Sequence, residues 1–124
     1  MEVVLTEREA TLMEVLWRRG PSTVAEVKED LSDDLAYTTV LTVLRTLEAK
    51  GYIGHNEEGR AHRYEAIVAR DLARRSALRA LKRKLFEGSV ELLLTHLVSD
   101  ENLSNAEVQR IKRLLNQRRK GEKQ

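Results

Sequence analysis

The fold of this chain is constrained most by a helical segment that ends at a glycine and leads directly into two extended segments. The stretch "LAYTTVLTVLRTLEAKGYI" begins at Leu35 and has the apolar periodicity of a helix from Tyr37 to Lys50. Gly51 follows, at the position where a left-handed residue commonly ends a helix. The buried face of this predicted helix consists of Val40, Leu44 and Leu47.

The two extended segments predict a β-hairpin. The runs "YIGHNE" and "AHRYEAI" alternate side chains around Glu58-Gly59. Upstream, Thr6 with Glu9 and Thr23 with Glu26 have the spacing of capping boxes, and Gly20-Pro21 separates the two helices that they begin. The helix that begins at Thr23 and the helix from Tyr37 to Lys50 are joined by a tight turn, and the β-ribbon follows directly. This order is that of a winged helix-turn-helix.

The second half of the chain predicts three further helices. The first begins near Ala69 and ends at Gly88, the second begins at Ser89, and the third begins at a capping box of Ser104 and Glu107. We therefore expect a mainly α-helical protein with a small β-hairpin wing. A winged-helix DNA-binding domain would occupy residues 1–67, and a helical dimerisation domain residues 68–124.

The outer face of the helix after Leu35 is unusual because it carries threonines where Glu and Lys are common. A short side chain lets a helix approach the floor of the DNA major groove, where its hydroxyl and methyl groups contact base edges. Two wing arginines suit contacts to the backbone or minor groove. The candidate DNA contacts are Tyr37, Thr38, Thr39, Leu41, Thr42, Arg45, Thr46, Arg60 and Arg63.

Other interpretations of these residues stay open. The threonine face can be merely solvated, and the wing arginines can pair with Glu57, Glu58 or Glu65. A winged-helix adaptor that contacts proteins and never binds DNA is the alternative of a different class. A ligand-sensing repressor of the same shape and, more remotely, a hydrolase or metalloenzyme are further alternatives.

Charge is distributed unevenly between the two halves. Residues 1–67 hold 8 Lys and Arg against 13 Asp and Glu, which gives −5, whereas residues 68–124 hold 14 against 7, which gives +7. The basic run after Ala69 is either a solvated helix face or a source of phosphate contacts from Arg70, Arg74 and Arg75. Binding in a groove needs only a local basic patch, so the acidic first half does not exclude it.

Several classes of function are excluded or unsupported. The chain has no cysteine, so disulfides, thiolate metal sites and cysteine nucleophiles are excluded. His55, His62 and His96 match no metal-ligand spacing, although the first two face each other across the predicted hairpin. No catalytic motif stands out, so we expect a non-enzyme without metal or cofactor. No signal peptide or membrane-spanning segment is predicted, which indicates a cytoplasmic protein.

The leucines of the second half are too numerous to remain exposed on a single chain. We expect them to join two copies into a homodimer, which would present two recognition helices to a pseudo-palindromic DNA site. The predicted dimer contacts are Leu78, Leu81, Leu85, Leu92, Leu93, Leu97, Val108, Ile111 and Leu115.

The segments "LTEREATLMEVLW", "LAYTTVLTVLRTLEAKGYI", "GRAHRYEAIV" and "LSNAEVQRIKRLL" resemble, in order, the BlaI/MecI family of penicillinase repressors. The resemblance implies an amino-terminal winged helix, carboxy-terminal dimerisation helices and palindromic operators of β-lactam-resistance operons and of the repressor's own gene. It assigns groove contacts to Thr38, Thr39, Leu41 and Thr42. Some members carry Lys and Arg in place of Thr38 and Leu41.

The same resemblance implies how repression would be relieved. Family members are inactivated when a membrane-bound sensor protease system leads to cleavage in the dimerisation helices. The matching bond here lies near His96–Leu97, where staphylococcal members have Asn-Phe. The copper-responsive branch carries a carboxy-terminal cysteine cluster, and its absence here excludes copper sensing through thiolates.

Overall fold

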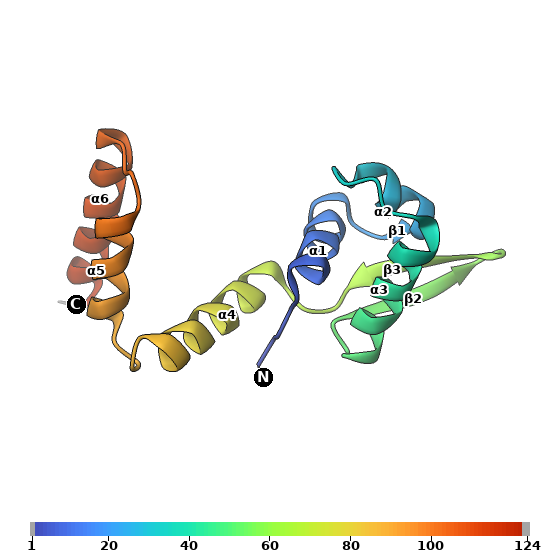
Figure 1. Cartoon of the computed structure of the whole chain (residues 1–124), viewed down its shortest axis with the longest axis horizontal. Coiled ribbons are helices and arrows are strands. Elements are labelled where there is room, and N and C mark those ends of the chain that lie inside the picture. Colours follow the sequence, from blue (N-terminus) through green and yellow to red (C-terminus); the bar gives the residue numbers. More distant parts are fainter. Residues whose placement is uncertain (1, 123–124) are drawn as a thin grey trace. The chain divides into compact units, whose positions relative to one another are not determined.

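The computed structural model describes residues 2–122 and contains six helices and a three-stranded antiparallel sheet in that range (Figure 1). The elements run in the order α1 (Glu7–Arg19), β1 (Ser22–Thr23), α2 (Val24–Asp30), α3 (Tyr37–Ala49), β2 (Ile53–Glu58), β3 (Ala61–Ala66), α4 (Arg70–Leu85), α5 (Val90–Asp100) and α6 (Asn105–Glu122). The predicted winged helix-turn-helix with following helices is confirmed.

The chain divides into two compact units, one up to Ala80 and one from Leu81. The division falls inside α4, so the first part of that helix belongs to the winged-helix unit. The backbone N–H of Val3 donates to Ser76 Oγ at 2.6 Å, and both residues are buried. This contact ties the amino-terminal segment to α4. The predicted functional boundary after residue 67 stays a prediction.

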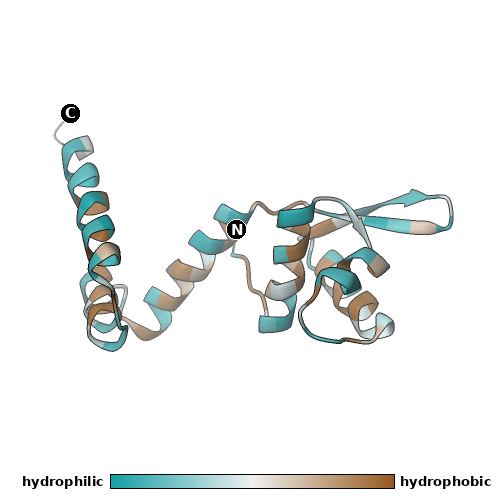
Figure 2. Cartoon of the chain, turned by 90° about the horizontal axis from the view of Figure 1, so that it is seen from above, coloured by the Kyte–Doolittle hydropathy of each residue, from teal (hydrophilic) through white to brown (hydrophobic). Residues whose placement is uncertain are grey.

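The first unit is built around a core shared by α1, α2, α3 and the sheet. Val40, Leu44 and Leu47 of α3 are fully buried, which confirms the predicted inner face of that helix. They pack with Leu12 and Leu16 of α1 in one hydrophobic cluster. Figure 2 shows hydrophobic residues recurring along these helices and a mainly hydrophilic wing.

Local capping explains where most helices begin. Thr6 with Glu9 and Thr23 with Glu26 form complete capping boxes, and Ser104 exchanges the same hydrogen bonds with Glu107. Ser89 Oγ accepts from the N–H of Leu92 at 3.0 Å and begins α5. All four helix starts predicted from these residues are confirmed.

The end of α3 is fixed by Gly51. This glycine has φ +83°, and the N–H groups of Gly51 and Tyr52 donate to the carbonyls of Glu48 and Leu47 at 2.9 and 3.1 Å. These two hydrogen bonds form the Schellman arrangement that a left-handed glycine permits. The chain therefore reverses sharply from α3 into the first strand of the wing.

The wing contains the predicted hairpin and one strand that the sequence did not reveal. β2 pairs with β3 from Ile53–Ala66 to Glu58–Ala61, and Gly59 takes φ +63° in the two-residue turn. β1 adds only Ser22 and Thr23 to the other edge of β3. A two-residue strand has no alternation to recognise, which is why periodicity missed it.

Candidate nucleic-acid interface

The outward face of α3 presents the predicted side chains to solvent. Thr38, Thr42 and Thr46 are exposed, as are Tyr37 and Arg45, whereas Thr39 and Leu41 are half-buried. The buried stripe on the opposite side fixes this orientation, because rotating the helix would expose three fully buried apolar residues. Seven of the nine predicted DNA contacts thus lie on one helix.

Two of the threonine hydroxyls already have backbone partners. Thr42 Oγ1 donates to the carbonyl of Thr38 at 2.8 Å, and Thr46 Oγ1 donates to the carbonyl of Thr42 at 3.0 Å. A threonine hydroxyl that bonds the preceding turn is satisfied within the helix. The methyl group can therefore make an apolar contact without leaving a polar atom unpaired.

The amino terminus of α3 differs from those of the other described helices. Its N-cap residue, Ala36, makes no side-chain hydrogen bond, and its first turn has no acidic residue. Each of the other described helices has an Asp or Glu in its first turn. The unpaired N–H groups and the positive end of the helix dipole at Tyr37 are thus available to a phosphate.

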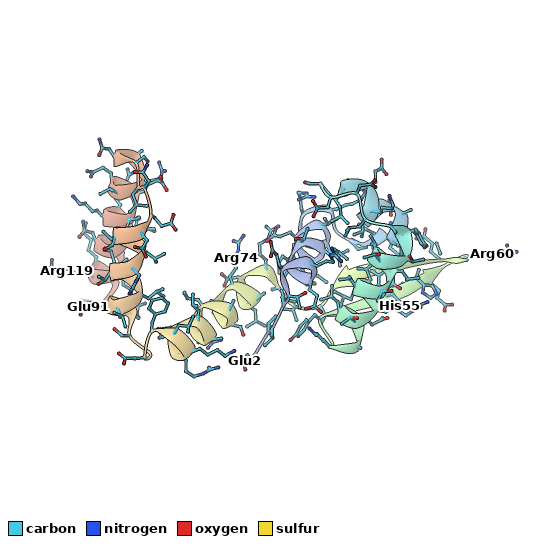
Figure 3. All side chains as sticks on the ribbon, viewed as in Figure 1. Glu2, His55, Arg60, Arg74, Glu91 and Arg119 are labelled. Atoms are coloured by element: carbon cyan, nitrogen blue, oxygen red, sulfur yellow. The ribbon has the colours of Figure 1, made fainter. Side chains whose placement is uncertain are left out.

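Arg60 and Arg63 differ in their surroundings. Arg60 lies in the two-residue turn at the wing tip, is exposed, and forms no ion pair within the described chain (Figure 3). Arg63 is half-buried; its Nε donates to Glu58 at 2.7 Å and its Nη1 to Glu26 at 2.8 Å. Arg63 therefore links the wing to α2, whereas Arg60 is available for a partner.

The groups that surround Glu26 lower the pKa of its carboxyl group. The backbone N–H of Thr23, which donates to this carboxylate, has the largest effect and lowers the pKa. Burial has the next largest effect and raises it, and Arg63 and Arg19 lower it further. Together they lower the pKa of Glu26 to about 2. The carboxylate therefore remains charged and keeps Arg63 in place throughout the physiological pH range.

A cleft of about 320 Å³ separates the start of α3 from the wing. Two of the predicted cations, Arg45 and Arg60, line it together with Tyr37, which suits an anionic backbone. Its wall also includes side chains that the sequence did not single out for this role. The full lining is Thr23, Val24, Ala25, Tyr37, Leu41, Arg45, Arg60, Ala61, His62 and Tyr64.

The basic run at the start of α4 is largely neutralised within the first unit. Arg70 and Arg74 lie 3.1 and 3.8 Å from carboxylate oxygens of Glu14, and Arg75 Nε lies 3.1 Å from Asp71. The Arg70 guanidinium also lies 5.8 Å from the centre of the Trp17 ring. The contacts of Arg70 and Arg74 favour a role in attaching α4 to α1, and Arg75 is paired within α4, so a role in contacting phosphates is less favoured.

The two wing histidines face each other, as the sequence indicated. The rings of His55 and His62 stack with 4.5 Å between their centroids. Glu57 lies beside them, and His55 Nδ1 contacts a carboxylate oxygen of Glu48. Spacing along the sequence missed this convergence, because the residues come from two strands and a helix.

In the second unit, α5 and α6 expose many apolar side chains. A groove of about 330 Å³ is lined by Leu94, Leu97, Val98, Glu101, Leu103, Val108, Ile111 and Lys112. Among the predicted dimer residues, Leu85, Leu97 and Leu115 are exposed, whereas Leu93 is buried in its own chain. The described helices include none that is long and apolar enough to cross a lipid bilayer.

The penicillinase repressor family matches residues 5–117. The chain belongs to this family. It is similar to the transcriptional regulator BlaI of Mycobacterium tuberculosis, with 38% identity over 110 residues that cover 86% of this chain and 80% of the relative. The methicillin resistance regulatory protein MecI of Staphylococcus aureus is 20% identical over 92% of this chain and 94% of its own. The penicillinase repressor of Bacillus licheniformis is 20% identical over 97% and 95%.

Solved structures with this fold include regulators of another family. A MarR family protein from Bacillus stearothermophilus has a TM-score of 0.52 at 16% identity, over 98% of this chain and 78% of its own. Staphylococcus aureus MarR, solved with salicylate and kanamycin, has a TM-score of 0.53 at 14% identity, over 91% and 70%. At these identities the likeness shows only the winged-helix fold.

Membership of the penicillinase repressor family decides between the classes of function. The family consists of DNA-binding transcriptional repressors, so the chain is a transcriptional repressor and not an enzyme. The adaptor alternative gains no support, because the α3 face carries mainly threonines and one aromatic residue, Tyr37, whereas protein interfaces are enriched in aromatic and methionine anchors.

Some exposed apolar residues of this penicillinase repressor family member escaped the sequence analysis. Val90, Leu94, Val98 and Leu114 are exposed to between 38% and 64%. The leucine periodicity of α5 pointed to one face, but Val90 and Val98 lie beside that face. The signal that identifies them is their apolar character at helix positions outside the leucine face.

Proposed function

We propose that the chain is a homodimeric repressor that binds palindromic operators through α3 and the wing. The observation that carries this proposal is the exposed Tyr, Thr and Arg face of α3, which leads into a cleft containing Arg45 and Arg60. This face combines a narrow profile, apolar methyl groups and positive charge. These are the properties of a helix that enters the major groove.

Different parts of the surface would have different tasks on DNA. Thr38, Thr39, Leu41 and Thr42, near the start of α3, would contact base edges. Tyr37 and the free N–H groups beside it would hold a phosphate, and Arg45 and Thr46 would follow the backbone further along the groove. Arg60 at the wing tip would reach the backbone or the minor groove.

The dimer would form through the apolar surface of α4, α5 and α6. Leu81, Leu85 and Leu97 are between 41% and 72% exposed on the single chain, and Leu114 and Leu115 add to this surface. Covering such residues with a second copy stabilises the pair by about 25 cal/mol for each Å² of apolar surface. A twofold dimer would place two α3 helices on half-sites roughly 34 Å apart.

Relief of repression would follow cleavage near His96–Leu97. Both residues are exposed, but they lie inside α5, where His96 Nδ1 is 3.6 Å from Asp100 Oδ2. A protease binds an extended strand, so α5 would have to unwind locally before cleavage. The regulated genes would be a β-lactam-resistance or related stress operon and the repressor's own gene, read in the cytoplasm, with a membrane sensor protease as partner.

Fluorescence anisotropy with duplex DNA from upstream of the protein's own gene tests the DNA-binding part. Affinity should fall steeply with salt, and Arg60→Ala should reduce the slope of log affinity against log salt by about one unit. Arg18→Ala on α1 is the control, because it removes an exposed arginine outside the proposed interface. Equal binding to unrelated DNA, or equal effects of both variants, would contradict this interface.

A further inference from the structure

We propose that the wing binds a zinc ion through His55, Glu57 and His62, and that this ion increases the affinity of the protein for DNA. The effect on DNA affinity rests on the proposed function, whereas zinc binding rests on the geometry of the hairpin alone. In residues 2–122 this is the one group of three metal-ligating side chains whose ligand atoms converge.

The strand register brings the three side chains to one face of the wing. Glu57 on β2 lies directly opposite His62 on β3, and His55 precedes Glu57 by two residues, so it shares the same face. The rings of His55 and His62 are nearly parallel, with an interplanar angle of 12°. One ligand atom from each of the three residues lies within 4.8 Å of those of the other two.

A tetrahedral zinc site requires these ligand atoms to move closer together than they lie here. Zinc binds imidazole nitrogen and carboxylate oxygen at about 2.0–2.2 Å, which separates neighbouring ligand atoms by about 3.3 Å. The stacked rings cannot both point a nitrogen lone pair at one ion, so at least one ring has to turn out of the stack when zinc binds. All three side chains are exposed, so the core does not oppose this rotation. Two imidazoles and one carboxylate leave the fourth position to water. Magnesium and calcium prefer oxygen ligands, so the histidines favour zinc.

A fourth residue already orients one of the ligands. The Nδ1 atom of His55 contacts the Glu48 carboxylate, which projects from α3. This contact leaves the Nε2 atom of His55 for a metal ion. Carboxylates that hold the second nitrogen of a ligating histidine commonly increase metal affinity 10- to 100-fold. Glu48 would therefore be a positioning residue that connects the site to the recognition helix.

The position of the site links it to DNA binding. His62 also lines the cleft that contains Arg45 and Arg60. A zinc ion there would offset the negative charge of Glu57 and add positive charge beside the path proposed for the DNA backbone. It would also join β2 to β3 near the wing tip. Attraction between a divalent ion and one phosphate about 8 Å away would raise DNA affinity about fivefold at low salt.

Isothermal titration of zinc chloride into the tag-free full chain, without DNA, tests the site itself. We expect one ion per chain and an affinity at least tenfold lower for His62→Asn and for Glu57→Gln. The matched controls are His96→Asn on α5 and Glu65→Gln, which lies on the opposite face of β3. No saturable binding, or binding that weakens equally in the controls, would overturn the site.

The effect on DNA is measured separately, by anisotropy with and without zinc. The wild type should bind about fivefold more tightly with zinc, and His55→Asn should lose this gain. DNA binding that persists while titration detects no zinc would overturn the metal site and leave the proposed function standing. Zinc binding that does not change DNA affinity would overturn the coupling alone. Absence of DNA binding under every condition would overturn the proposed function instead.

Discussion

At the scale of single residues, the structure separates side chains that hold the winged helix together from those left for a partner. Glu26 illustrates the first group, because it receives the N–H of Thr23 and the guanidinium groups of Arg19 and Arg63. Arg60 and Thr42 illustrate the second, since each faces solvent close to the proposed path of the DNA. Arginines of the same domain, such as Arg63 and Arg60, therefore have different tasks.

The lowered pKa of Glu26 predicts a specific dependence of stability on pH. Because its folded-state pKa is about 2, against an ordinary value of 4.5, its stabilising effect is complete above that ordinary value. The effect is lost as pH falls from 4.5 to 2. Glu26→Gln should therefore lower the midpoint of thermal unfolding at pH 7, and the difference from wild type should disappear near pH 2.

Circular dichroism melts at pH values from 2 to 7 measure this difference. Glu29→Gln is the control, because Glu29 is exposed on the same helix and forms no ion pair within the described residues. A difference for Glu26→Gln that stays constant across this range would contradict the prediction.

The backbone hydrogen bond of Thr42 predicts which of its groups matters on DNA. The hydroxyl already donates to Thr38, so the methyl group is the part free to contact a base. Thr42→Ser removes the methyl and should weaken operator binding about fourfold, the worth of one buried methyl group. Thr42→Val keeps a methyl and should bind within about twofold of wild type. If Val weakens binding more than Ser in the anisotropy titration, the hydroxyl makes the contact.

At the scale of elements, the boundaries of α3 determine what the interface can present. Ala36 leaves its amino terminus uncapped by any side chain, and Gly51 ends it in a left-handed turn. The following strand then starts at Ile53, which is buried beside the same core. The recognition helix and the wing are therefore fixed relative to each other by a connection of three residues.

Gly51→Ala should lower the free energy of unfolding by about 1–2 kcal/mol, the cost of a left-handed conformation for a residue with a Cβ. An added Cβ would meet nothing within 4 Å, so this cost comes from the backbone alone. Urea unfolding measures it. Gly121→Ala is the matched control: it lies in α6 without a positive φ, and alanine there should be neutral or slightly stabilising. Equal effects of the two substitutions would show that the conformation of Gly51 is not constrained.

At the scale of the whole molecule, charge and apolar surface divide between the two units. The acidic excess of residues 1–67 coexists with a cationic cleft, because ion pairs such as Arg63–Glu26 hide some charges and leave Arg45 and Arg60 available. The second unit instead exposes apolar residues that a single chain does not cover. This division agrees with the tasks proposed for the two units, which are DNA contact for the first and self-association for the second.

Val98→Glu should dissociate the proposed dimer, because it places a charge in the apolar groove between α5 and α6. Val98 is 59% exposed, so the substitution should leave the fold of the single chain intact. Sedimentation velocity should show a monomer, and operator affinity should fall at least 100-fold as the two half-sites lose their linkage. Ser99→Glu adds the same charge at an exposed polar position of α5 and is the control. A Val98→Glu protein that remains dimeric would place the interface elsewhere.

The sequence by itself determined the order of the helices and of the hairpin, and the residues at which most helices begin. Capping pairs such as Thr6 with Glu9, and the glycine at the end of α3, act over three or four residues, so local spacing is enough to predict them. The inner and outer faces of α3 followed from the helical period for the same reason.

Only the tertiary structure decided which side chains are free and which converge. Besides Glu58, which the sequence offered, Arg63 pairs with Glu26, 37 residues away. The contacts among His55, Glu57 and His62 depend on the register of two strands. Pairing of β1 with β3 and the exposure of Val98 likewise depend on packing between distant segments. Such contacts follow from the folded arrangement of elements, and no local period in the sequence encodes them.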